Sequence, residues 1–313
     1  MRELKLKQKI FSFMMIIIFL FVGAGAVSAA GDTVVAVTIL PQIEMVKAVA
    51  GDRVEVIEMI PQGFSPSNYA PSPAEMRAFD QASIYFSIGV PADIQNILPR
   101  AEARDNLKIV KLFQEIESKY PHHYFGEPES EENADHIHAD HGHSHAGGRD
   151  PHIWLSPARA QMMVKLIRDH LINILPEYEL EFKQNTKNYL EKINQIDQAN
   201  KKLLASYQGQ KILVYHPAFG YFVDHYDLEM IAIEEAGKEP GPRYLEQIIE
   251  LAKSQQIKTV FHQAEIDSNK TRAVAEELAG KRVELDPLAK NYSENLKLMA
   301  QKIAAVLAER ADN

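Results

Sequence analysis

The apolar positions of the N-terminal part of the chain predict alternating strands and helices. Four short runs rich in β-branched and aromatic residues are typical of buried strands, at 33–39, 54–60, 83–89 and 107–113. Amphipathic segments with a helical period lie between them, among them 73–81 and 92–103. Strand and helix in alternation predict a parallel sheet with helices on its faces.

The same alternation returns in the C-terminal part, after a stretch without strands. Further strands are predicted at 211–216, 228–234, 258–263 and 281–288, with helices at 241–256, 269–280 and 293–310. Between the two parts, residues 157–207 carry two helical blocks separated near Pro176. The second block has about thirty residues, or ~45 Å of helix. A helix of that length is not needed between neighbouring strands, so we expect it to connect two lobes.

The predicted fold is therefore α/β, with two lobes that each carry a mostly parallel sheet flanked by helices. The predicted segments are a signal peptide (1–30), an N-terminal lobe (31–174) with a histidine-rich loop at about 122–149, a connecting helix (175–207) and a C-terminal lobe (208–313). Ligands of open parallel sheets bind outside the carboxyl ends of the strands. The residues that follow each strand are therefore the ones to inspect for function.

The first thirty residues have the three-part layout of a secretory signal peptide. A basic start is followed by an almost uninterrupted apolar run and by the small residues of "SAAGD", which predict cleavage after Ala29 or Ala30. The alternative is an uncleaved membrane anchor, because the apolar run from 10 to 27 approaches the ~18 to 20 residues that span a bilayer. The small residues at its end favour cleavage.

Charge and cysteine content narrow the class of protein. Removing the leader takes away four positive charges and one negative charge, so the formal net charge changes from −9 to −12. Such an acidic protein is a poor partner for nucleic acid. The sequence has no cysteine, which excludes disulfides, thiolate ligands and a lipid anchor on cysteine. We expect a soluble, monomeric periplasmic protein whose metal ligands are nitrogen and oxygen atoms.

The stretch "ADHIHADHGHSHAGG" has a composition that indicates metal binding. It places five histidines within ten positions, namely His136, His138, His141, His143 and His145. Neutral imidazole is the commonest protein ligand for zinc and related cations. The surrounding residues are small or acidic and show no apolar periodicity, which is typical of a mobile loop rather than of a structured site. The loop either collects metal weakly or has incidental affinity.

Three other potential ligands follow the loop or predicted strands. His152 lies in "DPHIWLSP", His216 ends the strand in "LVYHPAFGYF", and Asp286 ends the last strand in "VELDPLA". Taken singly, each has a common structural explanation, because a lone histidine is often bonded to a carbonyl and an aspartate beside proline is often in a turn.

Taken together with the motifs that flank them, these three residues make the chain resemble a known family. It consists of the metal-binding substrate-binding proteins of zinc and manganese ABC transporters, the cluster A-I family. The resemblance runs from about Val34 to the C-terminus and includes "SPSNYAPSPAEM", "FSIGVPAD", "DPHIWLSP", "YHPAFGYF", "EEAGKEPGPRYLEQII" and "ELDPLA". It implies two lobes joined by one long rigid helix, with a divalent metal held in the cleft and delivered to an ABC permease. It assigns His152, His216 and Asp286 as ligands, with Zn²⁺ as cargo and Mn²⁺ or Fe²⁺ as alternatives.

One ligand of the zinc-type pattern is missing. Where those relatives carry Pro-His-x-Tyr, this chain has "PSNY", with Ser67 at the position of the histidine and Asn68 beside it. Zn²⁺ prefers imidazole, thiolate or carboxylate, whereas neutral oxygens suit harder cations. Water, an oxygen of Ser67 or Asn68, or another histidine can fill the position, or the cargo is not zinc. His262, at the end of its strand, is a candidate substitute expected to face the same cleft.

Two other classes of function remain to be weighed. Three ligands and an open position are also the catalytic arrangement of zinc hydrolases, for which Glu234, Glu235 or Glu265 could serve as general base. No His-Glu-x-x-His pair and no nucleophile motif supports that alternative. A metal buffer or adhesin would instead use the histidine-rich loop as its active part. The similar inserts of zinc-type relatives favour the loop as a collector for a transport receptor.

Overall fold

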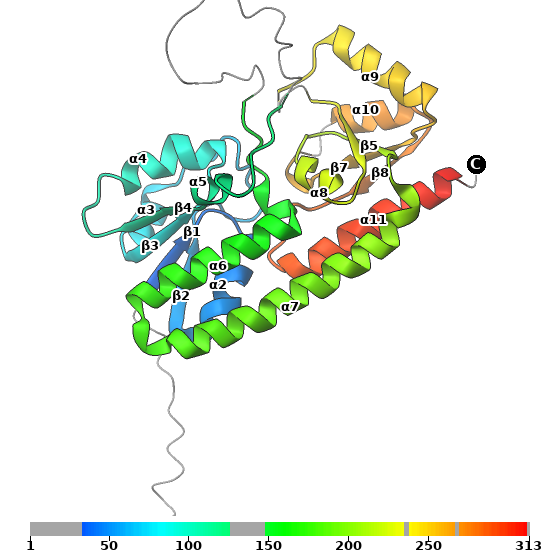
Figure 1. Cartoon of the computed structure of the whole chain (residues 1–313). Helices are drawn as coiled ribbons and strands as arrows, with labels where there is room; N and C mark the ends of the chain where they lie inside the picture. The colour runs from blue at the N-terminus through cyan, green and yellow to red at the C-terminus, as the bar shows by residue number, and fades with distance from the viewer. Residues whose placement is uncertain (1–32, 126–147, 235–237, 267–268, 312–313) are drawn as a thin grey trace, which may run out of the picture.

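The computed structural model describes residues 33–125, 148–234, 238–266 and 269–311, and it contains two parallel four-stranded sheets (Figure 1). The predicted signal peptide and the five histidines from His136 to His145 lie outside the described residues. Both sheets have the same pattern of strand order, β2-β1-β3-β4 in the first and β6-β5-β7-β8 in the second. The expected fold of two α/β lobes is confirmed.

The first sheet is built from the four strands that the apolar runs predict. They are β1 (Thr33–Val37), β2 (Val54–Glu58), β3 (Ala82–Ser87) and β4 (Lys108–Lys111). The helices of this lobe are α2 (Pro41–Ala50), α3 (Pro73–Phe79), the π-helix η2 (Asp93–Ile97), α4 (Leu98–Ala101) and α5 (Leu112–Glu117). Helix α3 begins where Ser72 and Glu75 form a capping box ahead of Pro73, so the local sequence fixes its start.

The second sheet follows the same plan. Its strands are β5 (Lys211–Val214), β6 (Glu229–Ala232), β7 (Thr259–His262) and β8 (Lys281–Glu284). Its helices are α8 (Gly220–His225), α9 (Pro242–Ser254), α10 (Asn269–Glu277) and α11 (Tyr292–Ala311). All neighbouring strands in both sheets are parallel, so their carboxyl ends lie along one edge of each sheet.

Helix α7 (Glu179–Leu204) is the long helix between the two sheets, and it runs beneath both of them (Figure 1). Its 26 residues correspond to ~39 Å. The buried side chains recur at every third or fourth position and form one stripe, which consists of Phe182, Thr186, Tyr189, Ile193, Asp197, Asn200 and Leu204. The stripe packs against α6 (Pro157–Ile174) and α2 on one side and against α11 on the other.

Polar contacts tie this helix to both lobes. Glu44, on α2, accepts a hydrogen bond from the hydroxyl of Tyr189 (3.0 Å) and one from the N–H of Ser293 at the start of α11 (3.2 Å). Asp197 accepts a hydrogen bond from His225, on α8, at 2.7 Å. The described side chains at these junctions are largely buried, so the helix is held from both sides. The domain boundaries drawn from the sequence stay predictions.

Two details differ from the sequence pattern. The run 107–113 forms only a four-residue strand, because the chain turns into helix α5 at Leu112. Helices α2 and α8 lie in stretches that we did not assign to helices. None of the helices in the described part of the chain is both long and apolar enough to cross a bilayer.

Candidate metal centre

A pocket of about 310 Å³ lies where the carboxyl ends of the strands from the two sheets meet. Residues that follow β2 and β3 line it from the N-terminal lobe, and residues that follow β5, β6, β7 and β8 line it from the C-terminal lobe. The lining residues that carry a polar side chain are Ser65, Ser67, Arg149, His152, His216, Lys238 and Gln263. The position of the pocket is the one expected for open parallel sheets.

A carboxylate orients the imidazole of His152 by contacting its Nδ1 atom. Asp150 accepts a hydrogen bond from the backbone N–H of His152 at 2.9 Å and contacts Nδ1 of its ring at 2.7 Å with the same oxygen. Burial lowers the pKa of His152, and the nearby His216 and Arg149 lower it further, against the opposing effect of Asp150. The ring is therefore neutral at pH 7, which is the form that binds a metal.

His216 follows β5 and has an equivalent partner. Its Nδ1 contacts the carboxylate of Glu234 at 2.6 Å, and Glu234 follows β6, the neighbour of β5 in the sheet. When a carboxylate accepts the proton of Nδ1, the lone pair of Nε2 is left for a metal, and this carboxylate–histidine arrangement is common behind metal ligands. Neither Nε2 has a hydrogen-bond partner among the described residues.

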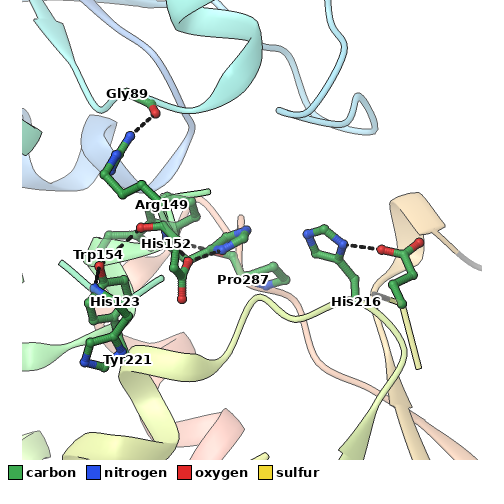
Figure 2. A network of polar contacts seen from close by, with 10 residues as sticks. Gly89, His123, Arg149, His152, Trp154, His216, Tyr221 and Pro287 are labelled. Carbon is green, nitrogen blue, oxygen red and sulfur yellow. Dashed lines mark hydrogen bonds and ion pairs between the residues drawn. The ribbon is translucent and has the colours of Figure 1, made fainter. Parts of the chain in front are cut away.

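The structure brings these two imidazoles together from different lobes. Their ring centroids are 5.4 Å apart and the planes meet at 79° (Figure 2). Each side chain is nine-tenths buried and lines the same pocket. Two imidazoles at this separation can share one cation with modest adjustment, since Zn–N bonds are ~2.0 to 2.1 Å long.

Asp286 does not join the two histidines in this structure. In the described ranges, no three His, Asp or Glu side chains converge closely enough to hold a metal ion. The carboxylate of Asp286 accepts the backbone N–H of Leu288 at 2.8 Å, while the neighbouring Pro287 and Leu288 line the pocket. Burial raises the pKa of Asp286, and the charge of Glu284 adds to that effect.

The residues considered for the missing ligand position separate into two groups. Ser67 lines the pocket and is exposed, but Asn68 is not among the lining residues. His262, the last residue of β7, is buried and its Nδ1 lies 3.4 Å from the carbonyl oxygen of Gln263. Gln263, the residue directly after β7, lines the pocket, whereas His262 is not among the lining residues.

Trp154 connects His152 to the segment that carries Asp286. Its indole is fully buried, and Nε1 donates a hydrogen bond to the carbonyl oxygen of Pro287 at 2.7 Å (Figure 2). The carbonyl oxygen of Trp154 accepts a hydrogen bond from the hydroxyl of Tyr292, also at 2.7 Å. The buried side chain of Trp154 therefore positions the 286–292 segment relative to His152.

The described residues on either side of the histidine-rich segment lie at the rim of this pocket. Tyr124 and Arg149 form an antiparallel bridge, and Phe125 donates its N–H to the carbonyl oxygen of Gly148 at 3.0 Å. Phe125, Gly148 and Arg149 all line the pocket. The backbone N–H of Asp150 donates to the carbonyl oxygen of His123 at 2.8 Å, so the base of the segment is bonded directly to the residue that holds His152.

Sequence reasoning missed the two carboxylates that hold the imidazoles. Asp150 lies two residues before His152, and Glu234 was considered only as a general base for a hydrolase. The structure places Glu234 on Nδ1 of His216, where it positions a ring. Of the other two proposed bases, Glu265 does not line the pocket and Glu235 lies outside the described residues.

Comparisons with known proteins identify similar sequences. A family model described as "ZnuA: Zinc-uptake complex component A periplasmic" matches residues 35–307. The zinc-binding protein AdcA of Streptococcus pyogenes serotype M3 is 26% identical over 295 residues, which cover 90% of this chain and 56% of that protein. The chain thus spans about half the length of this relative.

Solved structures match over almost the whole described chain. The crystal structure of ZnuA superimposes with a TM-score of 0.76 at 28% identity, covering 88% of this chain and 98% of the other. A ZnuA deletion mutant with zinc bound gives a TM-score of 0.74 at 29% identity, covering 87% and 96%.

Proposed function

Because the chain belongs to the family of the periplasmic zinc-uptake complex component A, we propose that it is a periplasmic receptor that captures Zn²⁺ between its lobes and delivers it to an ABC permease. The observation that carries this proposal is the pair of buried imidazoles, one from each lobe, each held at Nδ1 by a carboxylate. The zinc-bound relative supports zinc over manganese or iron as cargo.

His152 and His216 are the ligands that bind first. Both rings are already oriented, so little side-chain entropy is lost when the ion arrives. Asp286 is the third ligand, and its Oδ2 is left for the metal because the N–H of Leu288 is bonded to Oδ1. A movement of the 286–292 segment, or of one lobe against the other, completes the coordination sphere after the two imidazoles have engaged.

The loop with His136, His138, His141, His143 and His145 serves as a collector in this proposal. Its described ends lie at the rim of the pocket, so metal that it captures weakly is released next to the two imidazoles. The leader at residues 1–30 exports the protein, which then acts as a monomer without a lipid anchor. The acidic mature chain does not bind nucleic acid.

A receptor needs no general base. The described lining residues of the pocket include neither aspartate nor glutamate, and Glu234 is engaged by His216. We therefore do not propose a zinc hydrolase. A turnover assay on esters, phosphoesters and peptides with zinc added tests this point, and metal-dependent turnover abolished by His216→Ala would contradict it.

The experiment that tests transport is growth under metal starvation. A strain that lacks this gene should fail to grow when zinc is chelated, and the wild-type gene should restore growth. The double variant His152→Ala/His216→Ala should not restore it, whereas the surface variant Glu229→Gln should. Normal growth of the deletion strain under zinc starvation, with failure under manganese starvation, would assign another cargo.

A further inference from the structure

The pocket that contains the two imidazoles is much larger than a bare ion requires. Its volume of about 310 Å³ is roughly ten times the ~30 Å³ that one water molecule occupies in the liquid. This volume falls at the lower end of the range of small-molecule sites, which is ~300 to 1,000 Å³. The pocket therefore has room for a ligand that accompanies the metal.

The charges of the lining residues favour an anion. Arg149 and Lys238 line the pocket, and no aspartate or glutamate does so among the described residues. The two carboxylates closest to the imidazoles are bonded to Nδ1 on the side away from the free Nε2 atoms, and they match the two charges of a zinc ion. Neither Arg149 nor Lys238 has a carboxylate within ion-pair distance in the described part of the chain.

Two of the lining residues carry hydrogen-bond donors without acceptors. Gln263 is only 5% exposed and lines the pocket, but its Nε2 has no acceptor among the described residues. Nη1 of Arg149 is buried and also lacks one, while Nη2 is fixed by the carbonyl oxygen of Gly89 (Figure 2). Burying a donor without a partner is unfavourable, so such groups call for a bound acceptor.

The zinc-type ligand pattern also has an open position at this pocket. Ser67 lines the pocket where the zinc-type pattern has a histidine, and a serine hydroxyl is a weak ligand for Zn²⁺. A carboxylate oxygen is a good zinc ligand and also accepts strong hydrogen bonds from cationic donors. One ligand class therefore satisfies both the metal and the unpaired donors.

We propose that this pocket binds Zn²⁺ together with a small anion that carries two or more carboxylate groups. One carboxylate coordinates the metal at the position that Ser67 leaves open, and another accepts hydrogen bonds from Gln263, Lys238 and Arg149. The cargo is then a zinc carboxylate chelate rather than the bare ion. This inference rests on the proposed function, because it requires Zn²⁺ on His152 and His216.

Equilibrium dialysis of the full mature chain with radiolabelled citrate as the probe tests the inference. Zinc-loaded protein should retain about one citrate per bound zinc, and protein stripped of metal should retain none. Raising the citrate concentration should leave the zinc occupancy unchanged. If the protein bound only the bare ion, citrate would compete for zinc and the occupancy would fall.

Two variants test which lining residues bind the anion. Lys238→Glu reverses the charge of an exposed lining residue, and Gln263→Leu removes the unpaired amide at nearly constant volume. Each should weaken citrate retention about tenfold or more, the factor expected from losing one charge-assisted hydrogen bond. Lys297→Glu makes the same charge change on the exposed face of α11, away from the pocket, and should leave retention unchanged.

The outcomes separate this inference from the proposed function. Tight zinc binding without citrate retention would overturn the chelate inference and leave the zinc receptor intact. Equal citrate retention by wild type and Lys238→Glu would also overturn the inference, because the anion would lie elsewhere. Failure of the wild-type protein to bind zinc in any buffer would instead refute the proposed function.

Discussion

Replacing Asp150 by asparagine tests whether the carboxylate behind His152 contributes to metal affinity. Asp150 contacts Nδ1 of the ring at 2.7 Å and the backbone N–H of His152 at 2.9 Å, so Asp150→Asn preserves shape and removes the charge. Loss of such an outer carboxylate typically weakens metal binding 10- to 100-fold, or about 1.4 to 2.7 kcal/mol. Because burial already lowers the pKa of His152, the variant ring stays neutral at pH 7. The expected loss therefore reflects a weaker ligand rather than a protonated one.

Competition with a chromophoric zinc chelator at pH 7 measures this loss directly. Glu234→Gln, which makes the same change behind His216, should weaken zinc binding by a similar factor. Glu229→Gln changes an exposed carboxylate on β6 and serves as the matched control. Circular dichroism checks that each variant is folded. Zinc affinity of folded Asp150→Asn within twofold of wild type would refute the role assigned to the carboxylate.

Three further predictions concern Trp154, Asp197 and the histidine-rich loop. Trp154 is the only tryptophan of the sequence, and its ring centroid lies 5.3 Å from that of His152, so zinc binding should change the intrinsic fluorescence of the protein. Trp154→Phe should abolish that signal. It should also lower the affinity for zinc, because the hydrogen bond to Pro287 is lost. Burial raises the pKa of Asp197, but hydrogen bonds from His225 and Lys201 outweigh it and leave the pKa below its ordinary value. Its stabilising effect is thus present above the ordinary pKa of ~3.9 and is lost as the pH falls below it. Asp197→Asn should cost about 2 kcal/mol in urea denaturation at pH 7 and much less near pH 3, and an equal cost at both would contradict this sign. Deleting residues 134–148 should leave one tight zinc site in calorimetry and remove several weak ones, whereas loss of the tight site would show that the loop supplies a ligand.

The fold was accessible from the sequence because its strands are short, apolar and separated by amphipathic segments. Each of the eight predicted runs overlaps one strand of the structure. The boundary between β4 and α5 could not be predicted from the sequence. The apolar run continues through Leu112 and does not mark where the backbone changes conformation. Only packing against the rest of the lobe decides that point.

The site was predictable in part. His152 and His216 were predicted as ligands from their flanking motifs and their place after the loop and after β5. The structure places both rings in one pocket, and their role as ligands stays a prediction. Glu234 could have been assigned to His216 had the pairing of β5 with β6 been known, because both residues directly follow these adjacent strands. The hydrogen bond of Asp286 to Leu288 and the link from Trp154 to Pro287 depend on how the lobes pack, which no local pattern encodes.

The metal content of the purified protein tests the central claim most directly. Elemental analysis should find about one zinc per wild-type chain after weakly bound metal is removed by dialysis. His152→Ala and His216→Ala should each lose that zinc, while Glu229→Gln should keep it. Stoichiometric zinc in both histidine variants would contradict a metal centre between the two lobes.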